Sequence, residues 1–186
     1  MIRDWKRQQT TVVQKTRILD LCEVVDVSPY TGKTHNFVLI DSRAWVNMVP
    51  ITAREEIVMI RQFRHGSQQV TFEIPGGMND PAESPAEAAL RECHEETGYS
   101  AKVAHCLGEL NPNPALFNNT LHTFYGFVSE TTPSEYSSET EKTEVELVPI
   151  DALKPLLLGG GIGHALVCAT LWRFLYMWEK KELALD

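Results

Sequence analysis

The chain has 186 residues, which is enough for one well-buried domain and short for two. Its 25 acidic and 17 basic residues give a formal net charge of -8 at pH 7. This excess of negative charge disfavours a protein that follows long nucleic acid or an anionic membrane, whereas a small anionic ligand held through a metal ion remains compatible. The four cysteines form no CxxC pair, so neither a zinc site nor a disulfide framework is indicated.

The first fifteen residues are polar and lack the apolar stretch of a secretory signal, so a cytoplasmic location fits best. Short β-branched and aromatic runs then predict strands near 17–27 and at 35–40, 45–51, 57–63 and 70–74. Pro29 to Gly32 predicts a hairpin turn between the first two strands. We therefore expect a small antiparallel β extension over 1–42 and the main domain over 43–186.

A helix is predicted to begin at Pro85. Ser84 is suited to the N-cap, and Glu87 completes a capping box with it. Gly98 is suited to end the helix. The local chemistry therefore defines both ends of this element.

The later half alternates strands and helices. Strands are predicted at 102–110, 121–129 and 143–149, and helices at 150–158 and 162–181. The apolar residues 165–178 are interrupted by Thr170 and Arg173 and are too few to span a bilayer. The glycine-rich residues 159–164 lack the Lys-Ser or Lys-Thr of a phosphate loop and are expected to lead into the last helix. The prediction is an α/β protein with a mixed sheet flanked by helices.

Three glutamates, Glu92, Glu95 and Glu96, recur at helical spacing behind a glycine-rich turn. Such spacing places the three carboxylates on one narrow arc, where they repel one another unless a cation neutralises them. This pattern indicates a divalent-metal site. The alternative is a solvated acidic helix face, which is the commoner explanation for this spacing alone.

The residues around the glutamates favour the metal site, because the segment matches the signature of the Nudix hydrolases. The fixed places of that signature are filled by Gly77, Glu83, Arg91, Glu92, Cys93, Glu95, Glu96, Gly98 and Tyr99. The resemblance implies a Nudix fold and hydrolysis of a nucleoside diphosphate linked to another group. It also implies Mg²⁺, with Mn²⁺ as a substitute, held by Glu92, Glu95, Glu96 and the backbone carbonyl of Gly76. Glu83 and Arg91 would fix the loop against the helix.

Further features resemble the ADP-ribose pyrophosphatase and nucleotide-sugar hydrolase branch of that family. By this resemblance Arg61 or Arg64 would contact substrate phosphates, Glu73 would lie at the nucleotide or sugar end, and Pro114 would mark the substrate site. Since a spacing of three places Arg61 and Arg64 on opposite faces of a strand, at most one is expected to reach the ligand, and Arg64 is preferred.

Residues 131–142 have the composition of a surface loop, and a plain linker is the simpler interpretation. The branch resemblance instead makes Glu139 the carboxylate that orients or deprotonates water. Glu141 and Glu92 are the alternatives. The resemblance also implies a homodimer in which the N-terminal extension completes the partner's base pocket.

The function expected from these features is hydrolysis of the pyrophosphate bond of ADP-ribose or a related nucleoside diphosphate sugar. The products would be a nucleoside monophosphate and a sugar phosphate. Two alternatives stay open: a Nudix hydrolase of a dinucleotide cofactor or a 5′ RNA end, and a nucleotide-sensing Nudix module without turnover.

Overall fold

The computed structural model describes residues 1–130 and 142–184. Its contacts divide the chain into a first unit, Met1–Ala44 with Asn111–Thr120, and a second unit, Trp45–Leu110 with Leu121–Asp186. The segment 111–120 therefore packs with the N-terminal residues, although the sequence assigned it to the main domain. The domain boundary at residue 42 stays a prediction.

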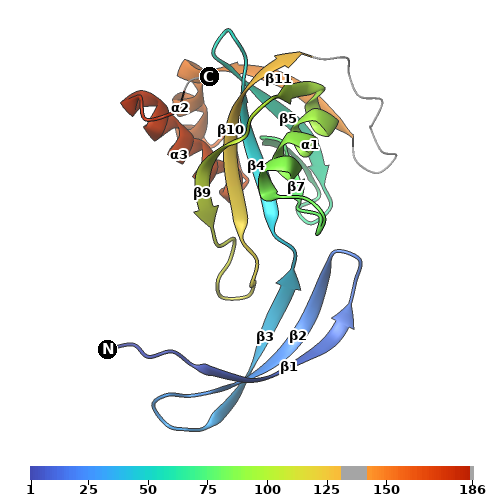
Figure 1. Ribbon diagram of the computed structural model, residues 1–186, viewed down its shortest axis with the longest axis vertical. Helices are drawn as coiled ribbons and strands as arrows, with labels where there is room; N and C mark the ends of the chain where they lie inside the picture. Colours follow the sequence, from blue (N-terminus) through green and yellow to red (C-terminus); the bar gives the residue numbers. More distant parts are fainter. Residues whose placement is uncertain (131–141, 185–186) are drawn as a thin grey trace. The chain divides into compact units, whose positions relative to one another are not determined.

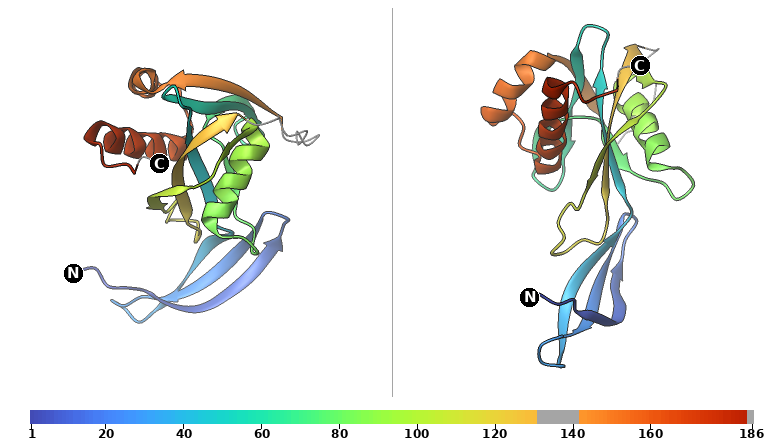
Figure 2. Two further views of the ribbon diagram at one scale, coloured as in Figure 1. Left: turned by 45° about the horizontal axis from the view of Figure 1, so that its top comes forward. Right: turned by 60° about the vertical axis from the view of Figure 1, so that its left-hand side comes forward.

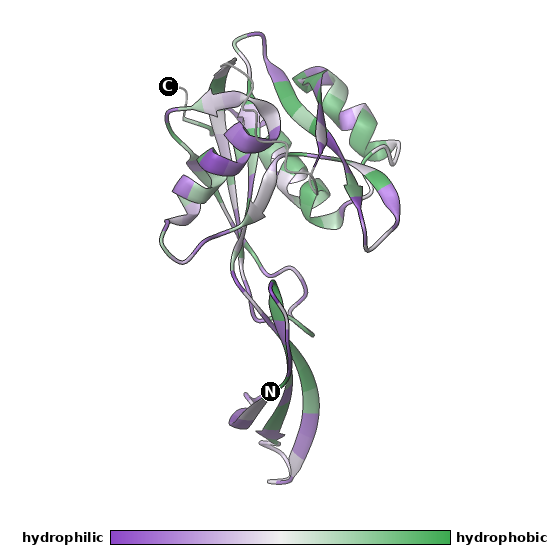
Figure 3. Ribbon diagram, turned by 90° about the vertical axis from the view of Figure 1, so that its right-hand side faces the viewer, coloured by the Kyte–Doolittle hydropathy of each residue, from purple (hydrophilic) through white to green (hydrophobic). Residues whose placement is uncertain are grey.

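The first unit is a three-stranded antiparallel sheet in the order β1–β2–β3 (Figure 1). Its strands are β1 (Lys6–Lys15), β2 (Leu19–Val27) and β3 (Thr34–Ser42). Gly32, at φ 71°, lies in the predicted turn before β3. Hydrophobic and hydrophilic residues are mixed along these strands (Figure 3). The predicted antiparallel β extension is confirmed.

Strand β1 was not predicted from the sequence. Its residues, KRQQTTVVQK, are all exposed, so no buried face gives them an alternating hydrophobic pattern. The strand pairs with β2 along nearly its whole length, from Lys6 opposite Val27 to Lys15 opposite Asp20. Backbone pairing rather than side-chain burial therefore accounts for this strand.

The second unit contains an eight-stranded mixed sheet whose central path is β11–β5–β4–β10–β8. Strands β4 and β10 are parallel, and the other pairs are antiparallel. The strands are β4 (Trp45–Ile51), β5 (Glu56–Arg64), β6 (Gln69–Glu73), β7 (Gly76–Met78), β8 (Tyr99–Ala101), β9 (His105–Leu110), β10 (Leu121–Glu130) and β11 (Thr143–Pro149).

Helix α1 (Pro85–Thr97) lies on one face of this sheet, and α2 (Ile150–Leu158) and α3 (Ala165–Lys180) lie on the other (Figures 1 and 2). Each face has its own core. Ala88, Ala89 and Cys93 of α1 pack with Val58 of β5 on the first face. Phe174 of α3 belongs to the second core, with Met59 of β5. The predicted mixed sheet flanked by helices is thus confirmed.

Two short strands were missed. β7 and β8 have three residues each and form by pairing with distant strands, β7 with β4 and β8 with β10. The strand predicted over 102–110 is confirmed only from His105, where β9 begins. Helix α3 begins at Ala165 with His164 as its N-cap, so residues 159–164 lead into a helix as expected. None of the helices in the described ranges has the length and apolar character to cross a membrane.

Candidate active site

The ends of α1 are fixed by the residues that the sequence indicated. The Ser84 side chain accepts a hydrogen bond from the Glu87 backbone N–H, and the Glu87 carboxylate accepts one from the Ser84 backbone N–H at 2.8 Å. Pro85 occupies the first turn, and Gly98 ends the helix at φ 73° in the left-handed region. The predicted capping box and the predicted helix end at Gly98 are confirmed, and they fix the two ends of α1.

Gly76 and Gly77 were expected in a turn but belong to strand β7, where they lie directly against two of the three glutamates. The Gly76 backbone N–H donates to Glu96 Oε2 at 2.8 Å. A Cβ atom at Gly77 would collide with the Glu92 carboxylate, and one at Gly76 would collide with the backbone of β4. Gly76 is therefore required for the close approach to β4, whereas a side chain at Gly77 would displace the Glu92 carboxylate.

Glu96 has a strongly shifted pKa. Burial raises its pKa to about 8, and the neighbouring Glu92 carboxylate acts in the same direction. The hydrogen bond from Gly76 opposes this shift without cancelling it. A buried carboxyl of this kind favours either a proton or a cation beside it.

Arg91 supplies positive charge to this cluster. Its Nη2 atom lies 2.7 Å from Glu83 Oε1, and its Nη1 atom lies 2.9 Å from Glu92 Oε1 and 3.0 Å from Glu95 Oε2. The hydrogen bonds with Glu83 raise the Arg91 pKa, so the guanidinium stays charged. The expected Glu83–Arg91 pair is present, and it ties the loop before α1 to the helix. The additional pairing with Glu92 and Glu95 was not foreseen.

Within the described ranges, no three histidine, cysteine, aspartate or glutamate side chains are already arranged to hold a metal ion. Glu92 and Glu95 are paired with Arg91, and Glu96 with the Gly76 N–H. The residue types nevertheless fit Mg²⁺, because three carboxylates and a backbone carbonyl are hard oxygen ligands. The absence of a side chain at Gly77 also lets the Glu92 carboxylate lie directly against the backbone before α1.

Arg64 and Glu73 are also brought together in this unit. Arg64 Nε and Nη2 each donate to the Glu73 carboxylate at 2.8 Å. Burial favours a raised Glu73 pKa, but hydrogen bonds from Arg64 and Thr71 outweigh it and the pKa is lowered. Glu73 is 1% exposed and the Arg64 side chain 41% exposed, so Glu73 holds Arg64 from beneath while part of the guanidinium faces outward.

Arg61 has different surroundings. Its guanidinium pairs with Glu146 of β11 at 2.8 Å and lies over the Phe72 ring, 4.3 Å from the centroid. Phe72 belongs to the core on the α2–α3 face, whereas the Arg64 partner Glu73 is the next residue along β6. The two arginines therefore point to opposite faces, as their spacing predicted.

Two residues beside Glu73 were missed by the sequence interpretation. The Thr71 hydroxyl donates to the Glu73 carboxylate, and His164 Nδ1 lies 3.5 Å from Glu73 Oε2. Thr71 could have been found, because it precedes Glu73 by two on a strand and shares its face. His164 lies far from Glu73 along the sequence, at the start of α3, and no local pattern connects the two residues. The buried Nδ1 of His164 has no hydrogen bond within the described part of the chain.

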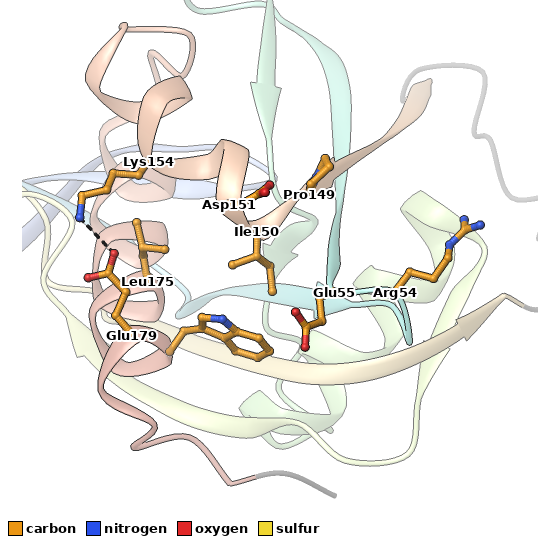
Figure 4. Close-up of a pocket in the computed structure, with 9 residues that line it drawn as sticks. Arg54, Glu55, Pro149, Ile150, Asp151, Lys154, Leu175 and Glu179 are labelled. Atoms are coloured by element: carbon orange, nitrogen blue, oxygen red, sulfur yellow. Dashed lines mark hydrogen bonds and ion pairs between the residues drawn. The ribbon is translucent and has the colours of Figure 1, made fainter.

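The remaining predicted site residues are not part of the contacts described above. Pro114 belongs to the first unit, where it lines a hollow of about 470 Å³ with Trp5, Phe37 and Leu116. Glu139 and Glu141 lie outside the described residues. A second hollow, of about 480 Å³, is bordered by Trp178 and by the Lys154–Glu179 ion pair of 3.0 Å (Figure 4). Neither hollow includes the glutamates of α1.

Comparison with known proteins identifies the family of the chain. The NUDIX domain model matches residues 41–167. The chain therefore belongs to the Nudix family of hydrolases, as the motif indicated. Enzymes of this family generally use divalent metal ions.

Several relatives carry related names. The chain is 31% identical over 142 residues to the ADP-ribose pyrophosphatase of Bacillus subtilis, covering 74% of this chain and 75% of that protein. It is 32% identical over 121 residues to the ADP-sugar pyrophosphatase of Mus musculus, covering 63% of this chain and 52% of the mouse protein. The match thus spans about half of the mouse relative. A crystal structure of an ADP compounds hydrolase has a TM-score of 0.82 at 20% identity, covers 98% of this chain and 97% of that one, and shows the shared fold.

Proposed function

We propose that this protein is an Mg²⁺-dependent pyrophosphatase that cleaves ADP-ribose or a related nucleoside diphosphate sugar. The products are a nucleoside monophosphate and a sugar phosphate. The observation that carries the proposal is the position of the Glu92, Glu95 and Glu96 cluster beside Gly76 and Gly77 of β7. The names of the Bacillus subtilis and mouse relatives support the substrate class.

The metal ligands in this proposal are Glu92, Glu95, Glu96 and the Gly76 carbonyl. A bound Mg²⁺ would neutralise phosphate charge and acidify a water for attack at phosphorus. Arg91 balances the charge of Glu92 and Glu95 in the free protein, which lowers the repulsion within the cluster. Its ion pair with Glu83 holds the loop before α1 against the helix.

Arg64 is assigned to substrate phosphate, because its partner Glu73 fixes its position and part of its guanidinium is exposed. Glu73 acts through Arg64 in this assignment. Arg61 is a weaker candidate, since its guanidinium pairs with Glu146 and lies over the Phe72 ring on the other face of the sheet. Glu139 remains the proposed carboxylate that orients the attacking water, with Glu141 and Glu92 as alternatives.

The first unit is proposed to form a homodimer interface and to complete a base-binding site. The hollow lined by Trp5 and Pro114 supports this role, because it offers an exposed aromatic ring beside apolar residues. A domain boundary at residue 42 belongs to the same proposal. A cytoplasmic location is also proposed, and the four free cysteines are compatible with it.

The test is incubation with Mg²⁺ and a panel of substrates, with the products identified. The panel contains ADP-ribose, GDP-mannose, UDP-glucose, NADH, diadenosine polyphosphates and 5′-triphosphate RNA. We expect ADP-ribose or another sugar nucleotide to be cleaved fastest. Preferred cleavage of NADH, of diadenosine polyphosphates or of the RNA would replace the substrate assignment. Binding without turnover of any member would favour a nucleotide-sensing module instead.

A further inference from the structure

Gln62 of β5 is a buried polar residue that no step above uses. The residue is 7% exposed, and its side-chain Oε1 atom is fully buried. No residue in the described ranges donates a hydrogen bond to this oxygen. A buried amide oxygen without a donor costs folding free energy, so its retention in the centre of the sheet needs an explanation.

The strand register places Gln62 among the groups of the candidate active site. It lies opposite Thr143 of β11 and opposite Thr71 of β6. Side chains that oppose one another in antiparallel strands share a face of the sheet. Gln62 therefore points to the same face as these two threonines, and to the same face as Arg64 two residues further along β5.

The two threonines beside Gln62 contact residues of the proposed metal site and of the proposed phosphate site. The Thr143 hydroxyl donates to the Glu96 backbone carbonyl at 2.6 Å, in the last turn of α1. The Thr71 hydroxyl lies on the other side, within hydrogen-bond distance of the Glu73 carboxylate that holds Arg64. In the strand register, position 62 thus lies between a residue that contacts α1 at Glu96 and a residue that contacts the partner of Arg64.

The same strand face is apolar before this point. Val58 and Ile60 precede Gln62 at a spacing of two, and both are completely buried. An apolar residue at position 62 would continue this pattern without the cost of burying an amide. The change from apolar to polar coincides with the approach to Arg64 and Glu96, which favours a binding role over a packing role.

We propose that the Gln62 side chain binds a hydroxyl group of the second sugar of the substrate, the one on the side of the pyrophosphate away from the nucleoside. This inference rests on the proposed function, since it assigns one contact within that substrate. The pyrophosphate itself carries no donor at neutral pH, whereas a hydroxyl both donates and accepts. A hydroxyl therefore satisfies the amide in either of its two orientations.

The test compares two ligands and two variants. Gln62→Met keeps the length of the side chain and removes its polar end. Gln69→Met, on the exposed start of β6, is the matched control. The two ligands are ADP-ribose and ADP whose terminal phosphate is capped by a methyl group, which has the adenosine and the pyrophosphate but lacks the second ribose and its hydroxyls. Kinetics with Mg²⁺ and calorimetric binding in EDTA are measured for both.

The proposed contact predicts that affinity is lost only for ADP-ribose, the ligand that carries the second ribose. Gln62→Met should raise KM and Kd for ADP-ribose about tenfold, which is the size of one hydrogen bond to a ligand, with kcat changed less than about twofold. Its effect on methyl-capped ADP should stay within about twofold. Its Tm should equal or exceed that of the wild type, because a buried group without a partner has been removed. Gln69→Met should change none of these values.

Equal losses for both ligands, no loss for either, or a clear fall in Tm would overturn the proposal. If Gln62→Met does not fold, Gln62→Asn serves instead: it keeps an amide but withdraws it by one methylene, and the same selective loss is expected. The calorimetry separates this inference from the proposed function. Wild-type binding of ADP-ribose without cleavage refutes the function alone, and unchanged binding by a Gln62 variant of an active enzyme refutes the Gln62 contact alone. Absence of both binding and cleavage in the wild type refutes both.

Discussion

The region around α1 and the N-terminal sheet achieve their structures by different means. Around α1, each charged side chain has a nearby partner, as Arg91 shows by contacting Glu83, Glu92 and Glu95. In the N-terminal sheet β1 is exposed throughout, and Cys22 and Val24 are the buried apolar residues of the described first unit. The structure around α1 is therefore stabilised by side-chain contacts within that region. The N-terminal sheet depends on backbone pairing and exposes apolar side chains for which a partner surface is proposed.

The largest effect is expected from the carboxylates of α1. Glu96→Gln should lower kcat by at least about 10³-fold, because it removes a proposed metal ligand. The fold should persist, since the new amide can still accept the Gly76 N–H and, unlike the carboxyl with its raised pKa, is neutral at every pH. Steady-state kinetics and thermal unfolding measure the two quantities. Glu95→Gln should lower turnover in the same direction, and wild-type activity of either variant in saturating Mg²⁺ would show that the site is misassigned.

The two arginines of β5 should differ in their effect on stability. Arg64→Ala leaves Glu73, 1% exposed, without its main partner and should cost about 1–3 kcal/mol of unfolding free energy. Arg61→Ala removes an ion pair with Glu146 in which both side chains are well exposed, and should cost about 1 kcal/mol or less. Urea unfolding at pH 7 gives both values. A larger loss for Arg61→Ala would contradict the contrast between buried and exposed pairs.

The stability difference between wild type and Arg64→Ala should depend on pH. The Glu73 pKa is lowered in the folded state, so its pairing stabilises the protein fully above about 4.5 and is lost as the pH falls through the folded value. The difference should therefore be largest near pH 7 and shrink toward pH 3. His164 and Glu96 also act on this region but are present in both proteins. A difference that grows in acid would show that Glu73 is not the partner that matters.

The smallest effect on the fold is expected in the N-terminal sheet. Val38 of β3 is 55% exposed, so Val38→Lys should change the unfolding free energy by no more than about 0.5 kcal/mol. It should nevertheless weaken the proposed homodimer by placing a charge in an apolar interface. Light scattering should report about twice the 21.0 kDa chain mass for the wild type and a lower mass for the variant. A wild-type monomer with full activity would refute the role assigned to a partner chain.

Sequence reasoning succeeded where structure is local. The caps of α1 follow from Ser84, Glu87 and Gly98, and the strand at 45–51 follows from a short run that is apolar except for Asn47. It failed where distant pairing decides the structure, as in β7, whose three residues are a strand only because β4 lies beside them. The exposed strand β1 was missed for the related reason that its residues bury no face.

The same distinction applies to the candidate site. The spacing of Glu92, Glu95 and Glu96 indicated a shared helix face, but not that Arg91 would pair with the first two. The approach of His164 to Glu73 depends on where α3 begins relative to the sheet, which no local pattern reveals. The residues of the motif were therefore predictable, and their tertiary partners were not.

The central claim is tested most directly by the products formed from ADP-ribose with and without Mg²⁺. We expect AMP and ribose 5-phosphate in equal amounts when Mg²⁺ is present, no release of inorganic phosphate, and no cleavage when EDTA removes the ion. Cleavage that persists in EDTA, or the absence of these products at saturating Mg²⁺ and ADP-ribose, would contradict the account.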